Sequence, residues 1–123
     1  MNMKAIVDGI KILTAETLEK SNKIYPLFRN LHEAYAVIKE EFEEAEEAGK
    51  SAKDSFETIW ENTREDEISN GIISAKRMST ALEFQIAELI QTLAMCNKLI
   101  DSEKEIEKFF EKTHKNIKEK LND

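Results

Sequence analysis

The chain has 123 residues, of which 35% are charged and 41% hydrophobic, and it contains only three glycines and one proline. So few turn-forming residues exclude an all-β fold and a doubly wound α/β sheet, and the hydrophobic content excludes a disordered chain. The 25 acidic and 18 basic residues give a formal net charge of −7, which repels phosphate backbones, so no nucleic-acid partner is expected.

The first half of the chain carries two helical hydrophobic patterns. Hydrophobic residues at spacings of three and four predict a helix over about residues 2–21. Pro26 cannot lie inside a continuing helix without a kink, so it marks a boundary. The second helix is expected from Pro26 or Leu27 to about Ala48, and Gly49 is its expected stop.

Up to three more helices follow. Ser51-Ala-Lys-Asp54 has the form of a capping box and predicts the start of a short third helix. Polar residues over about 62–70 predict a turn, and a long helix is expected over about 72–100, with a last one over about 103–121. Ser102-x-x-Glu105 is a second possible capping box. The last two helices either separate there or are continuous.

Helices joined by short connections predict an all-α fold, an up-and-down bundle of four to five helices in a single domain over residues 1–123. A chain of this size can bury only a small core. The long helix is also apolar on two faces, so either it is central or a second subunit covers it. A homo-oligomer is therefore expected.

The cysteine content and the distribution of apolar residues bear on the compartment. Cys96 is the only cysteine, so no intrachain disulfide can form, which favours a reducing, cytoplasmic location. The N-terminal segment lacks the long apolar stretch of a signal peptide, and no apolar run approaches the roughly 20 residues that span a bilayer. No membrane partner is expected.

The acidic residues are concentrated in one region. Between Asn30 and Glu67 there are 13 acidic residues against four basic ones. This local excess suits cation binding, although a solvated acidic helix face is the alternative. At about 100° per residue, Glu41 interrupts an apolar helix flank and Glu44 lies at its edge. Two carboxylates one turn apart repel each other, and a divalent cation relieves that repulsion. Mg²⁺ suits them best, because it takes oxygen ligands and keeps waters that a phosphate can replace.

The long helix supplies a further carboxylate. Glu88 lies within its second apolar stripe, with Gln91 beside it. Glu88 and the carboxylates of the second helix could converge on one cation. The alternatives are a lysine or arginine partner for Glu41 and a satisfied hydrogen-bond network for Glu88. Tyr35, Trp60 and Phe84 could stack on a base or pack in the core.

The segments His32–Glu44 and Ala87–Met95 resemble the small MazG-like proteins, which are often prophage-encoded. That superfamily comprises all-α nucleotide pyrophosphohydrolases, including dimeric dUTPases, with an EExxE motif on one helix and an ExxD motif on a later one. The first motif matches Glu40, Glu41 and Glu44. In the second, Glu88 matches, and Gln91 stands in the place of the aspartate.

The resemblance implies that Mg²⁺ is held by Glu41, Glu44 and Glu88, and that Glu40 is a ligand or a water-orienting base. The substrate would be a nucleoside triphosphate, split by water at the α-phosphorus with release of pyrophosphate. Gln91 and Lys98 are candidate substrate-binding residues. Glutamine is a poorer Mg²⁺ ligand than a carboxylate, so a chain that binds nucleotide but has lost turnover is also expected. The alternative is a non-enzymatic, homo-oligomeric helical adaptor or structural protein.

Overall fold

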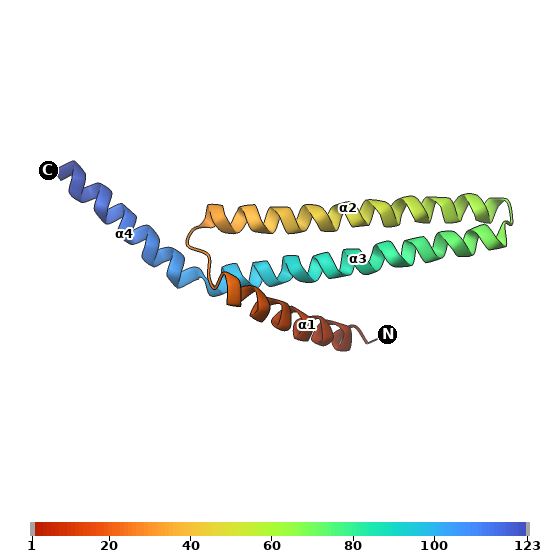
Figure 1. Ribbon diagram of the computed structural model, residues 1–123, viewed down its shortest axis with the longest axis horizontal. Helices are drawn as coiled ribbons and strands as arrows, with labels where there is room; N and C mark the ends of the chain where they lie inside the picture. Colours follow the sequence, from red (N-terminus) through yellow and green to blue (C-terminus); the bar gives the residue numbers. More distant parts are fainter. Residues whose placement is uncertain (1, 123) are drawn as a thin grey trace. The chain divides into compact units, whose positions relative to one another are not determined.

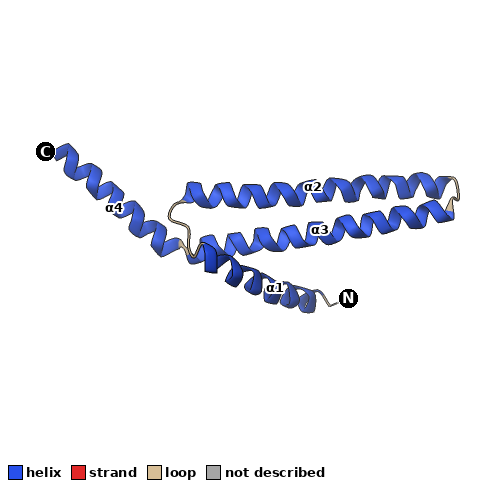
Figure 2. Ribbon diagram, in the orientation of Figure 1, coloured by secondary structure: helices blue, strands red, loops and turns tan. Residues whose placement is uncertain are grey.

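A computed structural model describes residues 2–122 and contains four helices, with no strand in that range (Figures 1 and 2). They are α1 (Met3–Ile24), α2 (Leu31–Arg64), α3 (Ile68–Asp101) and α4 (Glu103–Asn122). The expected all-α class is confirmed, with four helices. Within the described residues, no helix is both long and apolar enough to cross a membrane.

α2 differs most from the sequence expectation. The predicted stop at Gly49 and the new start at Ser51 are wrong, because α2 continues through both. A glycine inside a helix costs about 1 kcal/mol relative to alanine, so tertiary packing must offset it. A Cβ atom on Gly49 would lie 2.5 Å from Nε2 of Gln85 on α3. The glycine therefore allows the two helices to approach closely, and it does not end α2.

Local hydrogen bonds set the other helix boundaries. Oδ1 of Asn30 accepts a hydrogen bond from the backbone N–H of Glu33 at 2.8 Å, so α2 begins at Leu31 and not at Leu27. The expected turn over 62–70 shrinks to the three residues between α2 and α3. Asp66 in that turn has φ 54°, a left-handed conformation that aspartate tolerates better than most residues.

The chain falls into two compact units, and α2 and α3 contribute to both. Unit 1 comprises the residues up to Lys39 together with those from Ile90 onward. Unit 2 is Glu40–Leu89, an antiparallel hairpin of the later part of α2 and the earlier part of α3 (Figure 1).

Unit 1 has a small closed core that contains Phe28, Ala34, Ala94 and Met95. Ser102, fully buried, separates α3 from α4: its hydroxyl accepts from Phe28 N at 3.0 Å and donates to the Lys98 carbonyl at 2.6 Å. Of the two possibilities for the last two helices, the separation at Ser102 is therefore the correct one. The Ser102 side chain is held by a hydrogen bond from the backbone of Phe28, 74 residues earlier in the chain. A local capping motif cannot reveal such a distant contact.

Unit 2 has no large buried side chain. Within Glu40–Leu89 only Ala45, Ala52 and Ser74 are buried. Phe42 and Leu82, whose spacing from other apolar residues is typical of a helix core face, are exposed. Small residues lie between α2 and α3, and most large hydrophobic side chains of the hairpin are exposed.

Candidate metal centre

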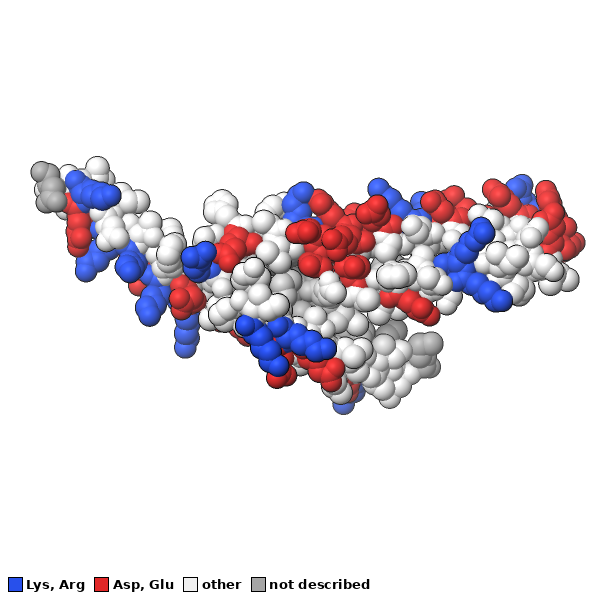
Figure 3. Space-filling view, viewed as in Figure 1, with Lys and Arg blue, Asp and Glu red and all other residues white. Residues whose placement is uncertain are grey.

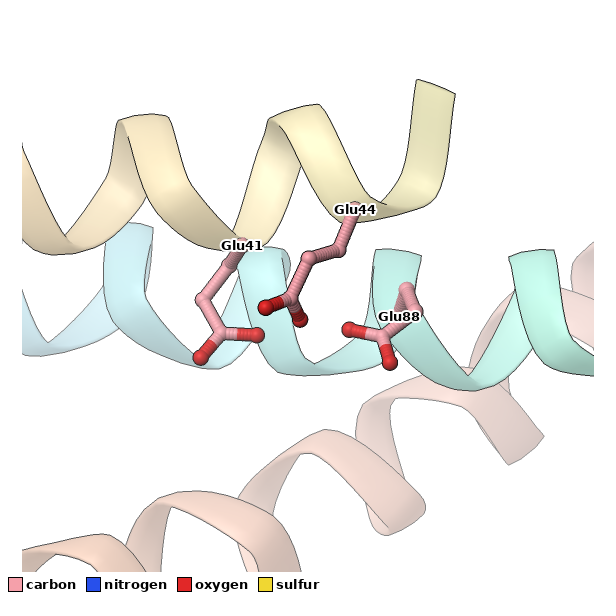
Figure 4. A group of neighbouring side chains, drawn as sticks. All are labelled: Glu41, Glu44 and Glu88. Atoms are coloured by element: carbon pink, nitrogen blue, oxygen red, sulfur yellow. The ribbon is translucent and has the colours of Figure 1, made fainter. Parts of the chain in front are cut away.

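Three carboxylates converge in unit 2. Glu41 and Glu44 lie on α2, and Glu88 lies on α3. One carboxylate oxygen from each residue lies within 4.8 Å of the other two. Figure 4 shows the three side chains pointing toward a common region between the two helices. The structure thus brings together the three residues that the sequence suggested as metal ligands.

The local fold explains the convergence. Glu41 and Glu44 are three residues apart, so both project from the same side of α2. Ala45 is buried beside them, and Gly49 lies against Gln85, so α2 approaches α3 closely here. This approach brings Glu88 of α3 near the two carboxylates of α2.

Carboxylates crowd one another in the cluster. Burial is the main factor that raises the pKa of Glu41 above its usual value of 4.5, and repulsion from Glu44, Glu88 and Glu40 and a hydrogen bond with Glu88 add to it. A hydrogen bond with Glu88 is the main factor that raises the pKa of Glu44, followed by repulsion from the same carboxylate. Every charged neighbour that shifts the pKa of Glu41 is another carboxylate, so a salt bridge is not the stabilising partner there.

Glu41 also has an orphaned oxygen. Its Oε2 atom is buried and has no hydrogen-bond partner. A buried carboxylate oxygen without a donor is expensive unless it is protonated or binds a cation. This is the feature of the site that a purely structural role explains least well.

The donor set fits a hard divalent cation. Three carboxylate oxygens are the ligand type that Mg²⁺ and Ca²⁺ prefer, with Mg–O bonds of about 2.1 Å. Two oxygens bound to one Mg²⁺ ion can therefore lie no more than about 4.2 Å apart. The three oxygens lie within 4.8 Å of one another, so a small change of side-chain rotamer would bring them within this range. Without a buried thiolate or imidazole in the cluster, zinc is not the expected ion.

A surface hollow of about 380 Å³ adjoins the carboxylates. It is lined by Glu44, Glu47, Ala48, Ser51, Ala81, Phe84 and Glu88. The Phe84 ring is 65% exposed, so it does not pack in the core of unit 2. Acidic side chains gather along α2 on the face of the molecule drawn in Figure 3.

The remaining predicted site residues differ in their surroundings. Glu40 is exposed and close enough to raise the pKa of Glu41. Gln91 is exposed and belongs to unit 1. Lys98, also in unit 1, is only 2% exposed, and its ammonium donates to Ser21 Oγ at 2.7 Å and to the Tyr25 carbonyl at 2.6 Å. Two of the three N–H donors of its ammonium are therefore engaged inside unit 1.

Glu47 was not predicted from the sequence to belong to the site. It lines the hollow, and its charge helps to raise the pKa of Glu44. The Glu44-x-x-Glu47 spacing was the available signal, because residues three apart lie on the same side of a helix.

Comparison with protein families, with curated proteins and with solved structures finds no match to this chain.

Proposed function

We propose that the protein is a Mg²⁺-dependent nucleoside triphosphate pyrophosphohydrolase or a descendant that binds the nucleotide without turnover. The observation that carries this proposal is the convergence of Glu41, Glu44 and Glu88 within 4.8 Å, with a buried Glu41 oxygen that has no hydrogen-bond partner. The resemblance of the two acidic segments to MazG-like proteins supplies the reaction type. The four helices, ordered with short connections, also suit the up-and-down bundle of that family.

Each carboxylate has a distinct role in this proposal. Glu41, Glu44 and Glu88 hold the cation. When bound, Mg²⁺ would neutralise phosphate charge and lower the pKa of a coordinated water. Glu40, exposed beside Glu41, orients the water that attacks the α-phosphorus. The negative charge of the cluster would repel a triphosphate, so substrate binding requires the cation.

Phe84 is the best candidate for contact with the nucleobase. It is exposed, and it lines the same hollow as Glu44 and Glu88. An aromatic ring stacks on any base, at about 1–3 kcal/mol per contact. Phe84→Ala should therefore raise the KM for nucleotide, while Mg²⁺ binding in the absence of nucleotide stays the same.

The test is pyrophosphate release from each deoxynucleoside triphosphate in the presence of Mg²⁺. Glu41→Gln should abolish release, whereas Glu46→Gln should not, because Glu46 is exposed on the same helix and is not a member of the cluster. Because Gln91 replaces the family's aspartate, nucleotide binding is measured in parallel. Binding without release supports the non-catalytic descendant, and neither binding nor release would refute the proposal.

A non-enzymatic helical adaptor is the second candidate. The observation that favours it is the number of large hydrophobic side chains exposed on unit 2, including Phe56 and Trp60. In that case the glutamates only solvate α2. The adaptor predicts that Glu41→Gln leaves all ligand responses unchanged, since the cluster would have no ligand.

A further inference from the structure

We infer that α4 is an interfacial helix that binds the surface of an anionic lipid bilayer. Its hydrophobic side chains Phe110, Ile117 and Leu121, called the lipid face below, would enter the outer part of the bilayer. The helix lies along the bilayer and does not cross it, so the inference replaces the expectation, based on spanning segments alone, that the chain has no membrane partner. It does not depend on the proposed reaction.

Unit 1, to which α4 belongs, leaves the lipid face uncovered. Ile106, near the start of α4, is half-buried and packs against the core of unit 1. From Glu107 to Asn122 every residue is exposed, and the exposed fractions of Phe110 and Leu121 are 66% and 81%. Most of the stability of a protein helix comes from packing of its apolar face. Among the described residues of unit 1, most of α4 has no such packing.

Lysines flank the lipid face on both sides. At about 100° per residue, Ile117 and Leu121 project roughly 20° to either side of Phe110. Lys118 and Lys120 project roughly 80° to either side of the same direction. Lysine side chains at such flanks extend along apolar surface and keep the ammonium in water. This arrangement suits a planar surface that has an apolar layer beneath a layer of phosphates, because both edges of the helix then meet phosphates.

Three other polar residues project toward the same side of α4. His114 lies roughly 40° from Phe110, and their rings stack with centroids 5.8 Å apart. Glu103 precedes Phe110 by roughly two helical turns and therefore lies before the lipid face. Glu107 projects roughly 60° from Phe110, at the edge of the face. The part of α4 that carries the lipid face after Phe110 thus has no acidic side chain on that side.

The later part of α4 reverses the charge of the chain. Over residues 112–122 there are four lysines and one glutamate, although the whole chain has a formal net charge of −7. An anionic membrane surface attracts each nearby lysine, and this attraction decays within a Debye length of about 8 Å at physiological ionic strength. The local positive charge, and not the net charge of the chain, therefore determines the electrostatic attraction of α4 to the bilayer.

A hollow of about 410 Å³ extends the lipid face into unit 1. Phe110 belongs to both, and Leu31 and Phe109 are among the other apolar residues that line the hollow. Arg29 also lines it, and its side chain is 72% exposed. The ion pair of Arg29 with Glu33 is long, 3.6 Å, and such surface pairs contribute little. Arg29 can therefore exchange it for a lipid phosphate while an acyl chain occupies the hollow.

The test is co-sedimentation of the full chain with two kinds of vesicle, phosphatidylcholine alone and an equal mixture of phosphatidylcholine and phosphatidylglycerol. We expect binding to the mixed vesicles that weakens with added salt, and at least tenfold weaker binding to phosphatidylcholine alone. Lys118→Gln and Lys120→Gln should each weaken binding to the mixed vesicles about fivefold. Ile117→Gln should weaken it at least tenfold without a change of charge.

Ile12→Gln is the matched control. Ile12 is 63% exposed on α1, so the same substitution is made on another helix of unit 1, and binding should stay as in wild type. Glutamine is a good helix former, and circular dichroism without vesicles verifies that the helices persist in each variant. Ultracentrifugation without vesicles reports whether the chain associates with itself.

Three results would overturn the inference. The first is a wild-type chain that does not bind the mixed vesicles, including one in which a second copy covers α4 and Ile117→Gln abolishes that self-association. The second is equal binding to both kinds of vesicle. The third is a loss of binding that is the same for Ile12→Gln and Ile117→Gln, or absent from both.

Discussion

In unit 1 a buried cation, Lys98, donates to Ser21 and to the Tyr25 carbonyl and lies 5.5 Å from the centre of the Phe28 ring. In unit 2 a buried carboxylate oxygen of Glu41 has no donor, and the neighbours that shift its pKa are other carboxylates. Burial moves the pKa of both groups toward the uncharged form, lowering that of Lys98 and raising that of Glu41, but Lys98 has two hydrogen bonds to neutral acceptors whereas Glu41 lies among other carboxylates. Perturbed carboxylates that crowd one another mark a candidate ligand site.

The largest loss of stability should come from removing Lys98, the buried charge that has hydrogen-bond partners. Lys98→Ala deletes two hydrogen bonds from a charged donor and leaves the Tyr25 carbonyl without one of its donors. We expect a loss of about 2–3 kcal/mol in the free energy of unfolding, measured by urea denaturation. Lys98→Met should cost less, because methionine fills the same volume and needs no partner. A loss below about 0.5 kcal/mol for the alanine variant would show that the buried ammonium does not stabilise unit 1.

The two units can also be compared by replacing one glycine in each, with a smaller expected change in the free energy of unfolding. Gly9 in α1 has nothing within 4 Å of the position that a Cβ atom would occupy, whereas a Cβ on Gly49 would lie 2.5 Å from Gln85 Nε2. Gly9→Ala should therefore gain most of the helix-propensity difference, about 1 kcal/mol, in thermal unfolding. Gly49→Ala should gain less, since the end of the flexible Gln85 side chain must move. Equal gains would indicate that the helices of unit 2 are not held in close contact at Gly49.

Removing the Glu41 carboxylate should change the free energy of unfolding by a small amount that depends on pH. The folded state raises the pKa of Glu41, so its contribution to stability is present below pH 4.5 and is lost as the pH rises through the raised value. At neutral pH, without divalent cations, Glu41→Gln should be more stable than wild type by about 0.2–1 kcal/mol, the range of solvent-screened charge pairs. Below pH 4.5 the difference should vanish. Urea denaturation at both pH values checks this, and a destabilised variant at neutral pH would instead reveal a hidden cationic partner.

The helices and the three carboxylates could be predicted from sequence, because helical periodicity depends only on the residues within one segment. Glu41 and Glu44 are one turn apart in any helix, and Glu88 interrupts an apolar stripe, so all three could be found without coordinates. The distance from Glu88 to the two carboxylates of α2 could not be predicted from sequence, because it depends on how closely α2 approaches α3.

The wrong predictions involve contacts between residues that are distant in the sequence. Gly49 has the local signature of a helix end, and only its contact with Gln85 explains why α2 continues. Phe42 and Leu82 have the spacing of core residues, yet they are exposed in the single chain. Periodicity identifies an apolar face, but it does not say whether the same chain or a second copy covers it.

The most direct test of the metal centre is a Mg²⁺ titration by isothermal calorimetry at neutral pH, with Mn²⁺ and Ca²⁺ as alternative ions. The wild-type chain and Glu46→Gln should bind one Mg²⁺ per unit 2, while Glu41→Gln should lose at least tenfold in affinity with its helical content unchanged. Each tenfold corresponds to about 1.4 kcal/mol of binding free energy. Identical titrations for all three proteins, or no heat from any of the ions, would contradict the claim that Glu41, Glu44 and Glu88 form a cation site.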